Sequence, residues 1–257
     1  MFKWSCVSAR SRVCVFSCLL TIVLGSPALA ATCSYASLNG VFGYVHGRPG
    51  TLAVVVVGQV TLDGQGNITN ASWTESDDGS ITTGTTTGTY AISPNCTGTL
   101  TLSNEDLVLS HFNIYLNLGN KAFQMIQSDS GTNQPGLGVA EGTVSCGLPG
   151  KELILTTNLV GFANGVPADT AGTVTLDGEG NISGTETFTT NGAVKTLSVT
   201  GTYTQNSNCT GTWQITPTGG MPTNFNTVVT NSGNGLLLIQ TDHGTITAGS
   251  AQTSASF

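Results

Sequence analysis

Most of the chain is a succession of short segments in which apolar and polar side chains alternate. In the segment that ends at Leu62, one face carries Val54, Val56, Gly58, Val60 and Leu62. A later segment, residues 172–176, alternates in the same way, with threonine at every second position. A period of two with threonine on the outer face is typical of half-buried antiparallel strands. No stretch shows a convincing helical period, so the pattern predicts an all-β protein.

The sequence also repeats itself at an offset of 113 residues, which slips to 114 around two glycine-rich turns. Three motifs recur: VTLDGQGNI at 60–68 as VTLDGEGNI at 174–182, TGTY at 87–90 and 200–203, and NCTGT at 95–99 and 208–212. Self-similarity at a fixed offset indicates repeated structural units. We therefore predict two copies of one domain, residues 31–144 and 145–257, after a leader at 1–30.

Turn residues divide each copy into about eight strands. In the first copy the strands are expected near residues 36–46, 52–62, 67–76, 81–92, 97–103, 108–117, 122–128 and 136–144. Asp78-Gly79 aligns with Asn191-Gly192, and both dipeptides favour the type I′ turn of a tight hairpin. Eight short strands joined by tight turns predict an up-and-down barrel that leaves no exposed sheet edge. The predicted fold is two tandem antiparallel eight-stranded meander barrels, with two β-sandwiches as the alternative.

The cysteines outside the leader share one spacing. Cys33 and Cys96 are 63 residues apart, and so are Cys146 and Cys209. An even number of cysteines with a repeated spacing predicts disulfides in an oxidising compartment, here one within each copy. A zinc site would need cysteine or histidine pairs close in sequence, and the chain has none, so no metal is expected.

The first thirty residues have the pattern of a secretory signal peptide. A basic start is followed by an apolar stretch, Val13 to Leu24, and by the small-residue sequence Ala28-Leu29-Ala30. The apolar stretch is shorter than the roughly 20 residues that a transmembrane helix needs. We therefore expect cleavage after Ala30 and a secreted, periplasmic or envelope location.

Composition narrows the classes of partner. The 257 residues carry a formal charge of −7, and only 8% of them are charged. Removal of the leader leaves Arg48, Lys121, Lys151 and Lys195 against fourteen carboxylates, a charge of −10. Such a chain has no basic surface for nucleic acid, and no cofactor motif is present, because the glycine-rich turns are followed by strands rather than by helices.

The repeated motifs resemble those of uncharacterised secreted repeat proteins of soil Acidobacteria and similar bacteria. The resemblance rests on the VxLDGxGNI hairpin, the TGTY strand, the CTGT segment and a closing strand with Gln-x-Asp, and it covers essentially the whole chain after the leader. It implies calycin-like barrels, similar in shape to avidin or allene oxide cyclase. It implies no activity and transfers no catalytic residue.

Few residues are candidates for catalysis. The histidines His46, His111 and His243 do not recur between the copies, and each is interpreted as a surface or loop-end residue. Carboxylate pairs for glycoside hydrolysis could come from Glu75, Asp77 and Asp78 or from Glu105 and Asp106. Both groups fall at predicted turns, and only Glu75 is placed within a strand. The acidic loops at 63–67 and 177–181 are interpreted as hairpin turns, because the glutamate that completes an EF-hand calcium loop is missing.

Ligand binding inside the barrels is the remaining possibility. Tyr90, Tyr203 and Trp213 are placed on the inward faces as candidate ligand-binding residues, with core packing as the alternative interpretation. Trp73 lies in mid-strand at a position that alternation predicts to face outward. It is interpreted as an exposed stacking platform for sugar or as a contact between domains. The leading hypothesis is a secreted, non-enzymatic binding or structural protein of unknown ligand. The alternatives are a calycin-like carrier of a small apolar molecule and an enzyme of the allene-oxide-cyclase type, which would require a buried carboxylate or histidine with a shifted pKa.

Overall fold

The computed structural model describes residues 32–47, 54–103, 109–132, 134–142, 146 and 152–254. The predicted signal peptide lies outside these residues, as do Arg48 and Lys151. Thr32–Phe257 form one compact unit. Within the described residues no helix is long and apolar enough to cross a membrane.

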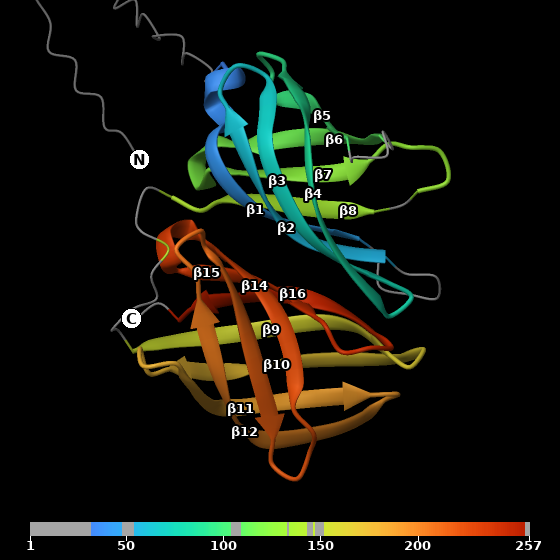
Figure 1. Cartoon of the computed structure of the whole chain (residues 1–257), viewed down its shortest axis with the longest axis vertical. Helices are drawn as coiled ribbons and strands as arrows, with labels where there is room; N and C mark the ends of the chain where they lie inside the picture. Colours follow the sequence, from blue (N-terminus) through green and yellow to red (C-terminus); the bar gives the residue numbers. More distant parts are fainter. Residues whose placement is uncertain are drawn as a thin grey trace, which may run out of the picture. The chain divides into compact units, whose positions relative to one another are not determined.

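The chain forms two closed antiparallel barrels, as predicted, and the sandwich alternative is wrong (Figure 1). Barrel 1 consists of β1 (Asn39–Gly47), β2 (Val54–Asp63), β3 (Asn67–Asp77), β4 (Ser80–Ile92), β5 (Thr97–Ser103), β6 (Leu109–Asn117), β7 (Ala122–Gln127) and β8 (Pro135–Ala140). Barrel 2 consists of β9 (Leu153–Ala163), β10 (Val166–Leu176), β11 (Asn181–Thr190), β12 (Ala193–Gln205), β13 (Thr210–Pro217), β14 (Thr223–Thr230), β15 (Gly235–Gln240) and β16 (Thr245–Thr253). Each strand pairs with the next, and the pairs β1–β8 and β9–β16 close the barrels.

Local turn chemistry explains the hairpins. Asp78 and Gly79 both have positive φ, 46° and 79°, and Asn191 and Gly192 have almost the same values, 48° and 80°. These are the dihedrals of the predicted type I′ turn. In the other repeated turn, the Asp63 carboxylate accepts hydrogen bonds from the backbone N–H groups of residues 65 and 67 and from the Asn67 side chain. The Asp177 turn has the same bonds, so both acidic loops are self-contained turns.

Both predicted disulfides are present, Cys33–Cys96 and Cys146–Cys209. Each of them joins the segment that precedes a barrel to the β4–β5 or β12–β13 turn of the same barrel. Two disulfides indicate an oxidising compartment outside the cytoplasm.

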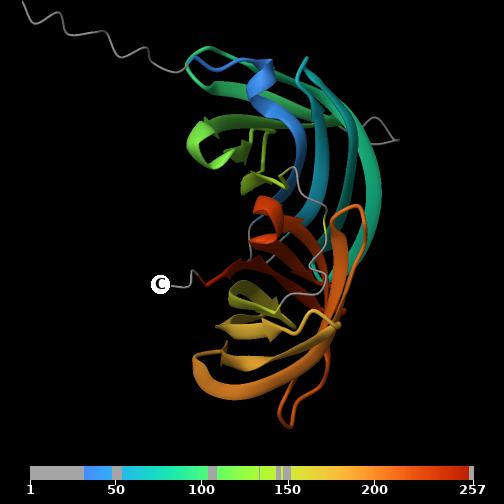
Figure 2. The same ribbon diagram turned by 90° about the vertical axis from the view of Figure 1, so that its left-hand side faces the viewer.

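A short 3₁₀ helix, η1 (Tyr35–Leu38), covers one end of barrel 1 (Figures 1 and 2). Leu38 is buried in the barrel core, and the Tyr90 hydroxyl donates to the backbone oxygens of Tyr35 and Leu38. The Tyr35 ring meets the Tyr90 ring edge-on at 5.7 Å. This end of the barrel is therefore filled, and any site inside barrel 1 must lie toward the opposite end.

A third apolar cluster joins the two barrels. Val55 and Val57, which point outward from β2, pack with residues of the second barrel: Val228, Leu237, Ile239, Ile246 and Ala248. Hydrogen bonds surround the cluster, including Ser76 Oγ to the backbone oxygen of Thr245 (2.6 Å) and Asn226 Nδ2 to Thr74 Oγ1 (2.9 Å). The domain boundaries at 31–144 and 145–257 stay predictions, but the repeats share an apolar interface.

Candidate functional site

Aromatic rings and glycines alternate across six neighbouring strands of barrel 1. The cross-strand partners form one row: Phe123, Gly138, Tyr44, Gly58, Trp73 and Gly84. A Cβ atom on Gly58 would lie 2.7 Å from Tyr44 Cζ, and Cβ atoms on the other two glycines would overlap the rings of Phe123 and Trp73. Each ring therefore occupies the space above a neighbouring glycine. We call this row the aromatic belt.

Two rings of the belt, Tyr44 and Trp73, line a cavity of about 240 Å³ at the end of barrel 1 away from η1. Its walls are mostly apolar, and a few polar groups converge on it. The lining residues are Tyr44, His46, Val56, Trp73, Glu75, Thr86, Leu102, Ser110 and Phe112. An apolar cavity of about 150 Å³ is enough to bind benzene, so this one has room for a larger planar molecule.

His46 is buried in this cavity, at 9% exposure, although we interpreted it as a surface or loop-end residue. Its ring stacks on Tyr44 at 6.0 Å and meets Phe112 edge-on at 5.0 Å. Nδ1 lies 2.9 Å from Gln134 Oε1, which can only accept a hydrogen bond, so Nδ1 carries the proton of the neutral ring and Nε2 is its acceptor. Burial lowers the pKa of His46 to about 4 despite this hydrogen bond. The imidazole is therefore neutral at physiological pH.

Glu75 lies in the same cross-strand row as His46, with Val56 between them. Adjacent strands are about 4.8 Å apart, so roughly 10 Å separates the two backbones, and a ligand atom fits between the side chains. Burial, and then the charge of Asp77, raise the pKa of Glu75. Burial, with a further contribution from Glu75, raises the pKa of Tyr44, so that its hydroxyl keeps its proton. The surroundings of His46, Glu75 and Tyr44 thus favour the neutral form of each side chain.

Trp73 faces this interior and packs against the core, which corrects the expectation of an exposed platform. The reason is a β-bulge in β3, where the pairing register shifts between Ile68 and Ala71. One extra residue reverses which side chains of a strand face inward. Beyond the bulge, Ala71, Trp73 and Glu75 therefore point into the barrel.

Barrel 2 has the same rows with different chemistry. The row that corresponds to the aromatic belt reads Leu236, Ala251, Thr157, Gly172, Glu186 and Leu197. Glu186 thus stands where barrel 1 has Trp73, and Phe188 stands where barrel 1 has Glu75. His46 is matched by Leu159. Only barrel 1 has the combination of aromatic rings, histidine and glutamate.

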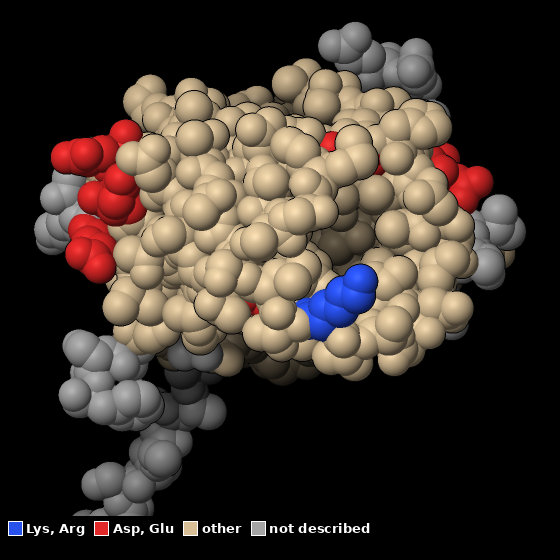
Figure 3. Space-filling model, turned by 90° about the horizontal axis from the view of Figure 1, so that it is seen from below, with Lys and Arg blue, Asp and Glu red and all other residues tan. Residues whose placement is uncertain are grey.

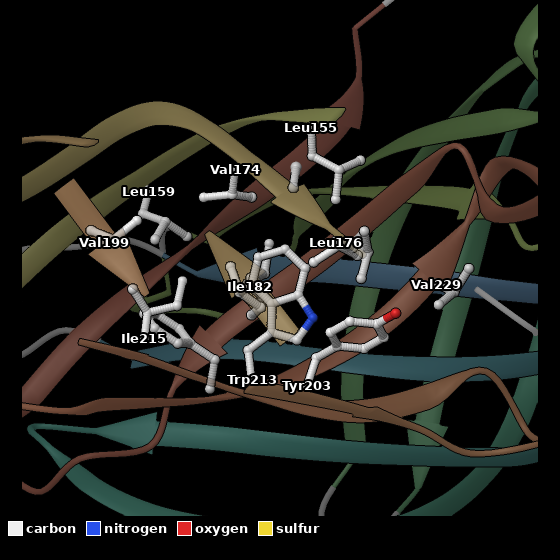
Figure 4. Close-up of a cluster of buried hydrophobic side chains, with 14 of the residues drawn as sticks. Leu155, Leu159, Val174, Leu176, Ile182, Val199, Tyr203, Trp213, Ile215 and Val229 are labelled. Atoms are coloured by element: carbon white, nitrogen blue, oxygen red, sulfur yellow. The ribbon is translucent and has the colours of Figure 1, made fainter. Parts of the chain in front are cut away.

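The residues predicted to bind ligand lie elsewhere in the barrels. Tyr90 belongs to the core of barrel 1, and Tyr203 and Trp213 belong to that of barrel 2, where Figure 4 shows them beside each other. Their inward placement agrees with the prediction. The Trp213 indole Nε1 is buried and has no hydrogen-bond partner. The cavity of barrel 1 is lined by other residues, and a ligand-binding role for these three stays a prediction.

The other histidines lie outside the two barrel interiors, and one disulfide lies beside a glutamate. His111 is exposed and forms an ion pair with Asp129, with Nδ1 2.6 Å from Oδ1. His243 is exposed as well. Glu141 lies close to Cys146 and Cys209, but these sulfurs form a disulfide and offer no thiolate to a metal.

Sequence reasoning set His46 aside because it does not recur between the copies, and it set Glu75 aside because the carboxylates at 75–78 fall at a predicted turn. Glu186 was not singled out. One signal was present. The repeat offset changes from 114 at Ile68 and Ile182 to 113 at the TGTY motifs, and this change marks the extra residue of the bulge. Applying the shift would have placed Trp73 and Glu75 on the inner face.

No protein-family model matches the chain, and no curated protein matches its sequence. Among solved structures, kievitone hydratase from Nectria haematococca aligns over 88% of this chain and 92% of its own length, with 10% identity and a TM-score of 0.29. A candidate AttH protein from Nitrosomonas europaea aligns over 83% and 92%, with 10% identity and a TM-score of 0.27. Similarity at these identities and TM-scores supports no conclusion about the chemistry of this chain. The resemblance to Acidobacteria repeat proteins stays a prediction.

Proposed function

We propose that this protein binds a small, planar, uncharged molecule in barrel 1, outside the cytoplasm. The observation that carries the proposal is the 240 Å³ cavity lined by two rings of the aromatic belt, into which His46 and Glu75 face. Cavities that bind small molecules combine apolar walls with a few polar groups that orient the ligand. The two disulfides support the compartment.

The electrostatics of the cavity select for neutral ligands. Burial keeps His46 uncharged, and no lysine or arginine lines the cavity among the residues that the structure describes. A carboxylate on the ligand would lose its hydration and would meet Glu75 without a compensating cation. A hydroxyl or carbonyl group on an aromatic or conjugated skeleton suits His46 Nε2 and Glu75 as hydrogen-bond partners.

The test is calorimetric titration with 2-naphthol, and with 2-naphthoate as the charged match. We expect saturable binding of 2-naphthol and at least tenfold weaker binding of the carboxylate, a difference of about 1.4 kcal/mol or more. Trp73→Leu should weaken binding of 2-naphthol at least tenfold, and Val56→Phe should do so by filling the cavity. Phe188→Leu makes an aromatic-to-leucine change in the cavity of barrel 2 instead and should leave the affinity unchanged. The proposal fails if 2-naphthol does not bind to the wild-type protein, or if it binds to Trp73→Leu and Val56→Phe as tightly as to the wild-type protein.

A second candidate function is proton transfer on such a ligand. It is favoured by the placement of His46 and Glu75 in one cavity, where burial lowers the pKa of His46 and raises that of Glu75. Opposed shifts suit a general acid and a general base. On an enolisable ketone, His46 Nε2 would take the α-proton while the Glu75 carboxyl protonates the carbonyl oxygen, and the reverse transfers would return the ketone.

This second candidate predicts deuterium exchange at the α-carbon of 2-tetralone in D₂O, followed by NMR. The exchange rate should exceed that with buffer alone and should fall at least tenfold in His46→Ala and in Glu75→Gln. Glu186→Gln in barrel 2 serves as the control. A protein that binds 2-tetralone without accelerating exchange would be a binder alone.

A further inference from the structure

Barrel 2 holds a buried carboxylate of its own. Glu186 on β11 is only 2% exposed, and its Oε1 accepts a hydrogen bond of 2.8 Å from the Thr157 hydroxyl. A Cβ atom on Gly172 would lie 2.7 Å from Glu186 Cγ, so the side chain crosses the space above that glycine. No lysine or arginine forms an ion pair with Glu186 among the described residues. A buried carboxylate without a cation is costly unless it binds a proton or a positive ligand.

Glu186 lines a cavity of about 140 Å³ in barrel 2. Apolar side chains form much of its wall: Leu159, Phe188, Ile215 and Phe225. Exposed Asp169 also lines it and accepts a hydrogen bond of 3.2 Å from the Gly161 N–H. The site therefore has a buried carboxyl group and aromatic side chains around a space of about the size that holds benzene, with the exposed Asp169 at its edge.

This combination suits an organic cation better than a metal ion. Calcium takes six to eight oxygen ligands and magnesium demands an octahedral shell, whereas Glu186 is the buried carboxyl group of this cavity and Leu159, Phe188, Ile215 and Phe225 cover much of its wall. Aromatic faces attract alkylammonium groups, and a carboxylate accepts their N–H protons. We propose that barrel 2 binds a small organic ammonium ion, with Glu186 as its counter-ion and Phe188 and Phe225 against its alkyl groups.

The inference does not depend on barrel 1. In the first barrel the position of Glu186 carries Trp73, so the two cavities should select different ligands, neutral in barrel 1 and cationic in barrel 2. The acidic balance of the chain also favours the approach of cations.

The charged groups around the cavity define the controls. Lys195 pairs in register with Phe188 and is exposed. Figure 3 shows a hollow with a basic side chain at its edge. Asp242 accepts hydrogen bonds from Asn224 and from the cavity residue Gln240. Lys195 is therefore the described side chain that could compete with an external cation for Glu186.

The experiment is titration of the full chain with trimethylammonium, followed by calorimetry, with tert-butanol as the neutral match of similar shape. We expect saturable binding of the cation and at least tenfold weaker binding of the alcohol. Glu186→Gln should lower the affinity at least tenfold, and Phe188→Leu severalfold. Because burial raises the pKa of Glu186 and only the carboxylate pairs with a cation, the affinity should rise with pH as Glu186 loses its proton.

Two variants test whether the cation binds at Glu186 rather than at another carboxylate of the chain. Glu75→Gln in barrel 1 should leave trimethylammonium binding unchanged, and Lys195→Met should keep or increase it. The proposal is overturned if the wild-type protein does not bind at millimolar concentrations, if Glu186→Gln binds equally well, or if only Lys195→Met binds. The last result would make Lys195 the natural partner of Glu186. Failure here would leave the 2-naphthol result in barrel 1 unaffected.

Discussion

At the scale of single residues, burial decides the chemistry of this protein more than residue type does. In water Glu75 would be ionised at pH 7 and His46 would titrate near pH 6.5, yet the surroundings favour the neutral form of each. Another histidine and carboxylate, His111 and Asp129, lie nearer the surface, with Nδ1 2.6 Å from Oδ1. Exposed pairs of this kind contribute little to stability.

Gly84 tests whether the aromatic belt depends on close approach to glycine. In Gly84→Ala the new methyl group would overlap the Trp73 ring, which must move. We expect a loss of about 1–3 kcal/mol in the free energy of unfolding, as for other overpacked sites, and weaker 2-naphthol binding. Urea unfolding measures the first effect. In the control, Gly119→Ala, the new methyl group meets only Asn117 Oδ1 at 3.6 Å and should change stability by less than about 0.5 kcal/mol.

At the scale of elements, the strands and turns follow from local sequence, whereas the register of β3 does not. Alternation and turn residues predicted the strands of barrel 1 to within a few residues, because each turn type demands particular dihedrals. The bulge in β3 has no such signature in one copy alone. Its one signal in the sequence is the change in offset between the copies. Trp73 was placed on the wrong face because the alternation was continued through β3 without that extra residue.

The disulfides belong to this scale, because each ties one segment to a turn of its own barrel. The double variant Cys146→Ser/Cys209→Ser opens a loop that spans 63 residues. The chain-entropy model then predicts a loss of about 4 kcal/mol. Thermal unfolding of the oxidised protein should show this loss, and the matching variant of Cys33 and Cys96 should show a similar one. A stability equal to that of the wild-type protein would contradict the model.

At the scale of the whole molecule, the two barrels share polar as well as apolar contacts. Gln59 Nε2 donates to Glu141 Oε1 at 2.6 Å and to the backbone oxygen of Asn208 at 2.5 Å. The Ser232 N–H donates to the backbone oxygen of Glu141 at 2.7 Å. Glu141 is 5% exposed, and burial raises its pKa to about 7 against the opposing effect of Gln59. The contact between the repeats therefore contains a group that titrates near neutral pH.

The titration of Glu141 predicts a pH dependence of stability. The folded protein favours protonated Glu141, so its stabilising contribution is complete below about pH 4.5 and is lost as the pH rises to about 7. The loss should be at most about 3 kcal/mol. Glu141→Gln should flatten this part of the stability profile relative to the wild-type protein. Denaturant unfolding at several pH values measures the difference, and parallel profiles of the two proteins would refute the assignment.

By itself the sequence determined the fold class, the two repeats, the hairpin turns and the disulfide pairing, because these depend on period, spacing and local dihedral preference. The tertiary structure alone decided which side chains meet across strands. The aromatic belt and the cavities at His46, Glu75 and Glu186 join residues that are far apart in sequence, and their registers depend on closure of the barrels and on one bulge. The shifted pKa values followed only from this packing, because burial and partners, rather than residue type, set the cost of a charge.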